Sequence, residues 1–372
     1  MKRILFYYSQ LNIGGAEKSL IRLMNAFAAK GNEVTFLGRY SSGAGEYLLS
    51  DKVNKHWLSG TLNKSNRFIY FLSLVKCFLE RLYSTYKIRR WPVFDVIYIG
   101  LQGLSPEFII DNLKARQICI FIRTDISSIP KKKAVIANFK THFDRIDSFI
   151  CVAETVRQSL IDAIPEAEEK AQVVYNILAA EDMRKRLTCA PNPFKNETEP
   201  TFRIVSICRI SDVSKGVFRM VRVCRQLVTE GFKFRWYIVG DGADLAALRQ
   251  KITDAGLDGI MITPGKVDNP FGYYRECDLV AMLSYYEGLC GVVNEAKISG
   301  KAIIATRVSG IDEQLTHGVN GWIVENDEDR ILEGMRRLLT DNNIIRSLTN
   351  DIYPEALTDD NSKIDKLLKL TE

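Results

Sequence analysis

The 372-residue sequence contains no Cys-x-x-Cys pair, although it has eight cysteines scattered along its length. Several of these cysteines lie inside apolar runs such as ICIFI and IVSICRI, which is typical of buried free thiols in a reducing compartment. The pattern therefore argues against a disulfide framework and against a structural zinc site. Histidine is scarce too, because His56, His142 and His317 are the only three.

The sequence also lacks a long hydrophobic run. The longest apolar stretch away from the expected strands is FIYFLSLV at residues 68–75, and a membrane-spanning helix needs about 20 such residues. The opening segment MKRILFYYSQLNIGG becomes polar before an apolar segment is complete, so we expect no signal peptide. These features predict a cytoplasmic protein.

Two families of binding motif are missing. There is no GxGxxG element, and the run VTFLGRY ends in arginine and tyrosine where a nicotinamide dehydrogenase would need an acid. No RNP, KH or zinc-finger pattern occurs, which argues against a nucleic-acid-binding protein.

Composition and charge describe what is present. Hydrophobic residues make up 46% and charged residues 26% of the chain, as in folded globular proteins. Residues 1–200 carry nine more Lys and Arg than Asp and Glu, whereas residues 201–372 carry three fewer. The basic front half indicates either an anionic partner, such as a phospholipid surface, a lipid-linked phosphate or a polyanion, or simply a solvated basic face.

Short apolar runs alternate with helical patterns along the whole chain, which predicts parallel sheets covered by helices on both faces. The expected strands of the front half cover residues 3–8, 33–38, 95–100, 118–123 and 148–153. Those of the back half cover residues 202–208, 235–240, 260–265, 278–284 and 302–306.

Two such series of strands predict two doubly wound α/β domains. We expect an N-terminal domain at residues 1–186, a proline-rich linker at 187–201 and a C-terminal domain at 202–345. Residues 346–372 are expected to form a helical tail that packs back on the N-terminal domain.

The segment 67–91 is predicted to be one helix, with apolar positions at 68, 71, 75, 78, 82 and 86 and a basic end. One interpretation is a helix packed on its own sheet. The other is an interfacial helix whose Lys87, Arg89 and Arg90 reach anionic headgroups or an acceptor.

Two glycine-containing turns are candidate phosphate sites. Gly14 and Gly15 follow the first strand, where glycine allows close backbone approach and the following helix directs its N–H groups at a ligand. In the back half, Arg209 and Lys215 flank the turn before Gly216, and two cations beside a helix N-terminus favour a diphosphate. Each signal also has a purely structural explanation.

The stretch YYEGLCGVVNEAKIS has acids on both sides of a glycine-containing turn. Glu287 lies on the expected loop, and Glu295 lies about one turn into the following helix with its side chain directed back toward the loop. The two acids are therefore expected to face one pocket. A ligand with a diphosphate between two hydroxyl-rich sugars needs both the cations and the carboxylates, which indicates a nucleotide-sugar.

With these residues in hand, the chain resembles the retaining glycosyltransferases of family GT4, which have the GT-B fold of two Rossmann-like domains. The most specific mark is the E-x7-E element from Glu287 to Glu295. Supporting marks are the GGAEK turn, Arg209 with Lys215-Gly216, GKVDNPFGYYRECD (265–278) and SGIDEQLTHGVNGWIV (309–324).

The resemblance implies roles for these residues. Glu295 would bind the ribose of the donor and Glu287 the donor sugar, while Arg209 and Lys215 would hold the diphosphate and stabilise its departure. The donor-binding set would also include turn residues of both domains, namely Gly14, Gly15, Gly265, Lys266, Val267, Gly288, Leu289, Cys290 and Gly291. No cofactor and no metal ion is implied. The only Asp-x-Asp, at residues 327–329, is expected to cap a helix.

One position departs from the family pattern. Relatives often carry histidine at the end of the strand that reads FIRTDIS here, where this chain has Arg123. An arginine cannot shuttle a proton, but it could bind an acceptor phosphate or the donor, and Asp125 could assume part of the missing role.

The resemblance, taken with the basic front half, implies a retaining hexosyltransferase that uses a UDP-sugar donor. Its expected acceptor is a lipid-linked saccharide, in the synthesis of a capsule, O-antigen or exopolysaccharide. Peripheral contact with an anionic membrane surface is a further expectation. The alternative function is a non-catalytic nucleotide-sugar-binding partner protein of the same fold.

Overall fold

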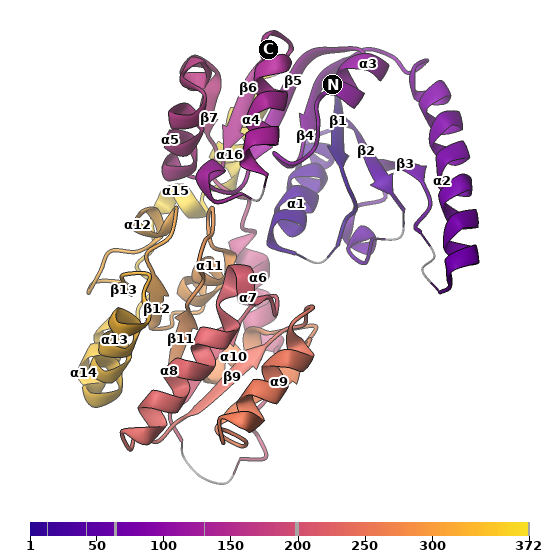
Figure 1. Cartoon of the computed structure of the whole chain (residues 1–372). Coiled ribbons are helices and arrows are strands. Elements are labelled where there is room, and N and C mark those ends of the chain that lie inside the picture. The colour runs from indigo at the N-terminus through magenta and orange to yellow at the C-terminus, as the bar shows by residue number, and fades with distance from the viewer. Residues whose placement is uncertain (13, 42, 63–64, 130, 198–200, 371–372) are drawn as a thin grey trace. The chain divides into compact units, whose positions relative to one another are not determined.

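The computed structural model describes residues 1–12, 14–41, 43–62, 65–129, 131–197 and 201–370 (Figure 1). They divide into two units, each with its own parallel sheet. The first unit contains residues 1–177 and 359–372, and the second contains residues 178–358. Within the described residues, every helix is too short or too polar to cross a bilayer.

The first unit has a seven-stranded sheet in the order β3-β2-β1-β4-β5-β6-β7. Its strands are β1 (Arg3–Tyr8), β2 (Glu33–Tyr40), β3 (Val53–Ser59), β4 (Phe94–Ile99), β5 (Ala115–Ile122), β6 (Ser148–Cys151) and β7 (Ala171–Val173). Its α-helices are α1 (Gly15–Ala29), α2 (Arg67–Ile88), α3 (Glu107–Asn112), α4 (Lys132–Thr141), α5 (Glu154–Ala163) and α16 (Asp360–Lys369). Short 3-10 turns occur at Glu46–Leu48, Ile126–Ser128, Phe143–Arg145 and Pro165–Lys170.

The second unit has a six-stranded parallel sheet in the order β10-β9-β8-β11-β12-β13. Its strands are β8 (Arg203–Ile207), β9 (Arg235–Val239), β10 (Met261–Gly265), β11 (Leu279–Met282), β12 (Ile303–Thr306) and β13 (Trp322–Val324). Its helices are α6 (Ala180–Cys189), α7 (Asp212–Lys215), α8 (Val217–Thr229), α9 (Leu245–Asp254), α10 (Phe271–Glu276), α11 (Gly291–Ile298), α12 (Ile311–Gln314), α13 (Glu328–Thr340), α14 (Asn342–Leu348) and α15 (Glu355–Thr358).

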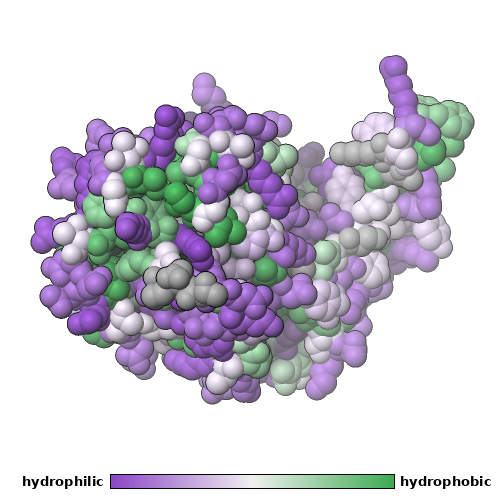
Figure 2. Space-filling model, turned by 90° about the horizontal axis from the view of Figure 1, so that it is seen from below, coloured by the Kyte–Doolittle hydropathy of each residue, from purple (hydrophilic) through white to green (hydrophobic). Residues whose placement is uncertain are grey.

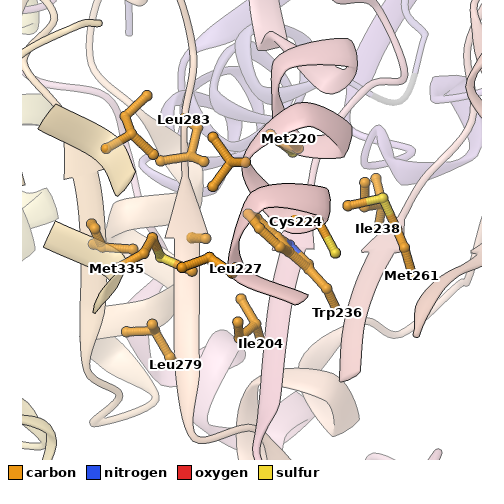
Figure 3. Close-up of a cluster of buried hydrophobic side chains, with 14 of the residues drawn as sticks. Ile204, Met220, Cys224, Leu227, Trp236, Ile238, Met261, Leu279, Leu283 and Met335 are labelled. Atoms are coloured by element: carbon orange, nitrogen blue, oxygen red, sulfur yellow. The ribbon is translucent and has the colours of Figure 1, made fainter. Parts of the chain in front are cut away.

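Both faces of the second sheet are buried, as the continuous apolar runs of its strands predict. Successive residues of β8 alternate between the two cores, with Ile204 on the side of α8, α9 and α13 and Val205 on the side of α6, α10 and α11. On the first side, the fully buried Trp236 lies among residues of α8 and the neighbouring strands (Figure 3). Its indole N–H donates to Ser206 Oγ at 3.0 Å, so the only polar atom of the ring is satisfied.

The division between the units differs from the predicted boundary at residue 186. Helix α6 belongs to the second unit, because Met183 is buried in its core and Arg186 donates to the carbonyl oxygen of Asp268 at 3.0 Å. The predicted linker at 187–201 thus falls inside the second unit, and its residues 198–200 lie outside the described residues.

The predicted tail at 346–372 is divided between the units. Residues up to Thr358 stay with the second unit, whereas α16 packs on the first. Leu367 of α16 is buried and its carbonyl accepts the hydroxyl of Tyr98 at 2.8 Å, and Lys363 donates to the carbonyl of Asn176 at 3.0 Å.

The exposure of α2 contradicts the interpretation of segment 67–91 as a helix whose apolar stripe packs on its own sheet. Its six-position apolar stripe does not pack on the sheet, because all six of those side chains are exposed. The side that meets β3 is small and polar: Cys77 donates to the carbonyl of Gly60, and Glu80 accepts the Gly60 N–H at 2.7 Å. An apolar stripe at helical spacing therefore did not mark a core-facing helix here.

Candidate functional site

The candidate donor site lies at the carboxyl edge of the second sheet, where loops after β8, β9 and β10 extend the strand pairing. Cys208 N–H donates to the Val239 carbonyl at 3.0 Å, and Gly240 N–H donates to the Gly265 carbonyl at 2.9 Å. A Cβ atom on Gly240 would lie 1.8 Å from the Cys208 carbonyl oxygen, so only glycine fits. Asp241 caps this turn by accepting the Gly242 N–H at 2.8 Å.

Lys215 and Glu287 form an ion pair at this edge. Lys215 is the last residue of α7 and Glu287 lies on the loop after β11, and their side chains are 23% and 14% exposed. Ser284 Oγ also donates to Glu287, at 2.6 Å. Burial disfavours the ammonium charge, but the carboxylate outweighs this effect and raises the pKa of Lys215 above its usual value. The pair is held in one geometry, with both groups charged.

Arg209 lies two residues beyond β8, at the same edge as the ion pair. Its side chain is exposed and makes no hydrogen bond or ion pair with other residues in the described part of the chain. In contrast to Lys215, it is a cation that is not neutralised by the protein. A diphosphate at this edge could pair with Arg209 directly, whereas it would share Lys215 with Glu287.

Glu295 is in the second turn of α11, whose N-terminal residue is Gly291. The carboxylate is half-buried and accepts the hydroxyl of Tyr274 at 2.9 Å. Burial, and then the charge of Glu295, raise the pKa of Tyr274 well above its usual value, so the phenol stays a donor. Tyr274 thereby fixes the direction of the Glu295 side chain.

Cys290 connects the surroundings of the two glutamates. Burial, followed by the charge of Glu287, raises the pKa of its thiol to about 12, and the same sulfur contributes to the raised pKa of Tyr274, the partner of Glu295. Gly288, Leu289 and Cys290 are buried, while Gly291 is exposed. The two carboxylates of E-x7-E have different partners, Lys215 for Glu287 and Tyr274 for Glu295.

Two residues that hold this loop escaped the sequence analysis. Gln314 accepts the Cys290 N–H at 3.0 Å and donates to the Cys290 carbonyl at 2.9 Å, and its side chain is fully buried. Gly310 has φ +76°, and a Cβ there would lie 2.2 Å from the Gly288 carbonyl oxygen. Both lie in the SGIDEQ segment, which belongs to one of the family marks. Its contact with residues 288–290 has no local sequence signal.

Arg219 of α8 is a third such residue. Its guanidinium is buried, donates to the carbonyls of Leu283 and Ser284 and to Asn326 Oδ1 at 2.7 Å, and lies over the Tyr285 ring at 4.1 Å. A buried cation with several carbonyl partners ties the end of β11 to α8. No sequence feature distinguishes it from Arg222 and Arg225, the other arginines of this helix.

The remaining predicted donor-binding residues of the second unit lie at the end of β10 and just beyond it. Gly265 has φ +86°, Lys266 is exposed, and Val267 packs against the core. Among the described residues, no three His, Cys, Asp or Glu side chains are grouped closely enough to hold a metal ion. Asp327 caps α13 by accepting the Arg330 N–H at 2.9 Å, as the sequence predicts.

In the first unit, Gly14 and Gly15 begin α1 at the carboxyl edge of the sheet. Arg123 follows β5 at the same edge and is only 7% exposed. Its Nε donates to the Gly100 carbonyl at 2.9 Å and its Nη1 to Asn176 Oδ1 at 2.8 Å, while Nη2 is buried without a partner. Burial lowers the pKa of Arg123 to about 10. It is a buried cation bonded to neutral oxygens.

The other three predicted acceptor residues lie at the opposite edge of the sheet from Arg123. Lys87, Arg89 and Arg90 lie at the end of α2, just before β4 begins, and so at the amino edge of the sheet. Strands of six residues, such as β4, are about 20 Å long, which separates the two edges. Asp125 is close to Arg123 in sequence, but its carboxylate accepts the Ser127 N–H at 2.7 Å and caps a 3-10 turn.

Comparisons with known proteins agree with this geometry. Residues 201–341 match the family model "Glycosyl transferases group 1". The chain is 27% identical to N-acetyl-alpha-D-glucosaminyl L-malate synthase of Bacillus anthracis over 53% of this chain and 52% of that protein. It therefore spans about half the length of this relative.

A second relative is matched over nearly its whole length. It is N-acetylgalactosamine-N,N'-diacetylbacillosaminyl-diphospho-undecaprenol 4-alpha-N-acetylgalactosaminyltransferase of Campylobacter jejuni, 21% identical over 97% of this chain and 96% of that protein. Among solved structures, Anabaena HepE in complex with UDP-glucose has a TM-score of 0.76 at 18% identity, covering 99% of each chain. The fold is therefore GT-B, and within it the second unit matches the group 1 glycosyltransferase family model.

Proposed function

We propose that the chain is a retaining hexosyltransferase that moves a sugar from a UDP-sugar to a saccharide acceptor. The observation that carries the proposal is the Lys215–Glu287 ion pair at the same sheet edge as the exposed Arg209. Cations suit a diphosphate, and a fixed carboxylate suits sugar hydroxyls. Glu295 is proposed to bind the ribose, and main-chain groups at residues 265–267 to border the base.

In the proposed reaction, the acceptor hydroxyl attacks the anomeric carbon from the face that the leaving group vacates. Its proton passes to the departing phosphate oxygen, and Arg209 and Lys215 stabilise the charge that grows on the diphosphate. Retention is supported by the two relatives with "alpha" in their names, because an α-linked product is what an α-linked nucleotide-sugar gives with retention.

The acceptor is proposed to be lipid-linked, in the assembly of a surface polysaccharide. The support is the name of the C. jejuni relative, which contains diphospho-undecaprenol, and the basic first half of this chain. Such an acceptor would bring the enzyme to the cytoplasmic face of a membrane.

The test is a calorimetric titration of the full chain with UDP and GDP, followed by UDP release from a panel of UDP-sugars with and without lipid extract. We expect UDP to bind and one sugar to give acceptor-dependent release. UDP binding with no release from any sugar would instead support the non-catalytic partner protein.

We also propose that transfer needs no divalent metal, because Lys215 and Arg209 supply positive charge beside the diphosphate. EDTA should leave the rate of UDP release unchanged. A loss of release that Mg²⁺ or Mn²⁺ restores would contradict this part of the proposal.

A further inference from the structure

Helix α2 presents an apolar face to solvent over its whole length. Among the described residues, twelve of the twenty exposed large apolar side chains belong to this one helix. The outward face has the spacing of a helical stripe and includes Phe68, Phe71, Val75, Phe78, Leu82 and Tyr86. Hydrophobic atoms, flanked by hydrophilic ones, are visible at the right-hand end of the molecule, where α2 lies (Figure 2).

The packed side of α2 is the polar one. Cys77 and Glu80 bond to Gly60, Ser73 and Ser84 are half-buried, and Ile88 is the one described residue of this helix that is buried. A helix that only covered its own sheet would have the reverse arrangement, with leucine and phenylalanine inward. A contiguous apolar face of this length marks an interaction surface.

Charge distinguishes between the possible occupants of this face. Residues 67–90 contain six arginine and lysine residues and one acid, Glu80. At the end of the helix, Lys87 lies 4.4 Å over the Tyr83 ring and Arg90 lies 4.0 Å over the Tyr86 ring. Aromatic rings beside cations are the side chains that anchor a helix at the boundary between headgroups and acyl chains.

A second copy of this chain is the less favourable occupant, because two such helices would bring like charges together as they buried their apolar faces. An anionic phospholipid surface satisfies both features at once. It accepts phenylalanine and leucine below the headgroups and neutralises the flanking arginine and lysine.

We propose that α2 is an interfacial helix that lies in the plane of an anionic phospholipid bilayer with its apolar face inserted. Its 22 residues are about 33 Å long. The helix begins after β3, at the same edge of the first sheet that carries Gly14 and Arg123. This inference rests on the proposed function, since it would bring that edge beside a headgroup layer in which a lipid-linked acceptor is embedded.

The experiment measures binding of the full chain to sedimented vesicles of phosphatidylglycerol and phosphatidylethanolamine, and to vesicles of phosphatidylcholine. We expect clear preference for the anionic vesicles, weakening with salt. The double variant Phe71→Glu/Leu79→Glu should lower the partition coefficient at least tenfold, because two inserted side chains become charged. Both positions are exposed, so thermal unfolding should stay unchanged.

The matched control is Ile352→Glu, an exposed apolar residue of the second unit, which should bind vesicles within twofold of the wild type. A second variant, Lys87→Gln/Arg90→Gln, should lose several-fold in affinity for anionic vesicles only. Equal binding of wild type and Phe71→Glu/Leu79→Glu would overturn the proposal. So would a dimer, seen by sedimentation, that the double variant dissociates while the wild type binds no vesicles.

Failure of this inference and failure of the proposed function give different results. If α2 is the interfacial helix, Phe71→Glu/Leu79→Glu slows transfer to a lipid-linked acceptor but leaves transfer to a water-soluble saccharide intact. Vesicle binding without any UDP release supports α2 and contradicts the glycosyl transfer. UDP release without vesicle binding supports the transfer and contradicts the role of α2.

Discussion

At the residue scale, the carboxyl edge of the second sheet holds two cations in different states. Lys215 is neutralised by Glu287, whereas Arg209 is exposed. Removing one member of such a pair leaves the other half-buried and unpaired, which costs more than the pair contributes. Replacing Glu287 and replacing Glu295 are therefore expected to change UDP binding and transfer differently, because only Glu287 has a cationic partner.

Replacing Glu287 or Glu295 with glutamine tests this difference. Glu287→Gln should lower kcat about tenfold or more and change UDP affinity less than threefold, a barrier increase of about 1.4 kcal/mol or more. Glu295→Gln should weaken UDP binding and transfer together, since it is proposed to bind the ribose. Calorimetry and UDP release measure the two effects, with the exposed Glu333→Gln as the control. UDP affinity unchanged by Glu295→Gln would contradict this division of roles.

Lys297 of α11 predicts a pH dependence of stability. Its side chain is fully buried and donates to the carbonyls of Leu348 and Asn350, and burial lowers its pKa to about 8 from 10.5. Between pH 8 and 10.5 the unfolded state binds more protons than the folded state, so this group makes the free energy of unfolding rise with pH. Below about pH 8, Lys297 is protonated in both the folded and the unfolded state, so the folded state carries the full cost of burying its charge.

The comparison is wild type with Lys297→Met in urea denaturation at pH 7 and pH 9. The variant removes the titration and also the donor of two carbonyls, so it should be less stable by about 1–3 kcal/mol. Its deficit should be larger at pH 9 than at pH 7. A deficit that is the same at both pH values would show that Lys297 titrates normally.

Residues whose pattern is local can be predicted as site candidates from the sequence, whereas residues that bond across the chain cannot. Glu287 and Glu295 were predicted from a separation of eight positions, and both surround the same loop. Gln314 binds Cys290 from 24 positions away, and Arg219 binds Leu283 from 64. Such contacts depend on sheet order, which the sequence indicates only after the strands are paired.

At the element scale, the strands missing from the prediction are β3, β7 and β13, and each lies at the edge of its sheet. An edge strand is less covered than a central one, so it need not be apolar on both faces. β3 reads VNKHWLS with exposed polar positions, and β7 and β13 are three residues long. The central strands, in contrast, were predicted within a few residues of their bounds.

The turn at Gly310 provides a test of loop packing. Gly310→Ala should strain a backbone at φ +76° and displace the Gly288 carbonyl, which its Cβ would approach to 2.2 Å. Gly318→Ala is a matched control, because Gly318 has φ +75° with open space around it. Both should lose about 1 kcal/mol of stability from the backbone alone, but only Gly310→Ala should also lower transfer tenfold or more. Equal transfer rates in the two variants would contradict a role for Gly310 in placing the loop.

Periodicity alone could not place α2. The same i, i+3, i+4 spacing occurs in helices that face a core and in helices that face a lipid surface. Which side packs is decided by Cys77 and Glu80 bonding to Gly60, a contact with the loop before the helix. The basic residues at its end were the one sequence feature that favoured the exposed arrangement.

At the scale of the whole molecule, the two sheets were predictable because two series of apolar runs occur in order. The boundary between the units was not predictable. In sequence, α6 follows the first series of strands, but it bonds to residues of α10 and of the loop before α10. The first unit is also discontinuous in sequence, because residues 178–358 separate its main part from α16.

Truncation after Thr358 tests which unit needs α16. The shortened chain should lose stability in the first unit, because Ile364 and Leu367 leave its core, by about 2–5 kcal/mol. UDP affinity, proposed to depend on the second unit, should stay within about threefold of the wild type. Leu367→Ala in the full chain should show a smaller loss of the same kind. A truncated chain whose stability is unchanged would contradict the packing of α16.

The return of α16 also has a consequence for synthesis on the ribosome. Every residue of the second unit has been made before α16 emerges, whereas the first unit begins with β1 and closes only with residues 360–369. Domains fold as their sequences become available, from the N-terminus onward. Here the unit that is started first is completed last, so the nascent first sheet lacks the cover over Tyr98 throughout the time that the second unit is being made and folded.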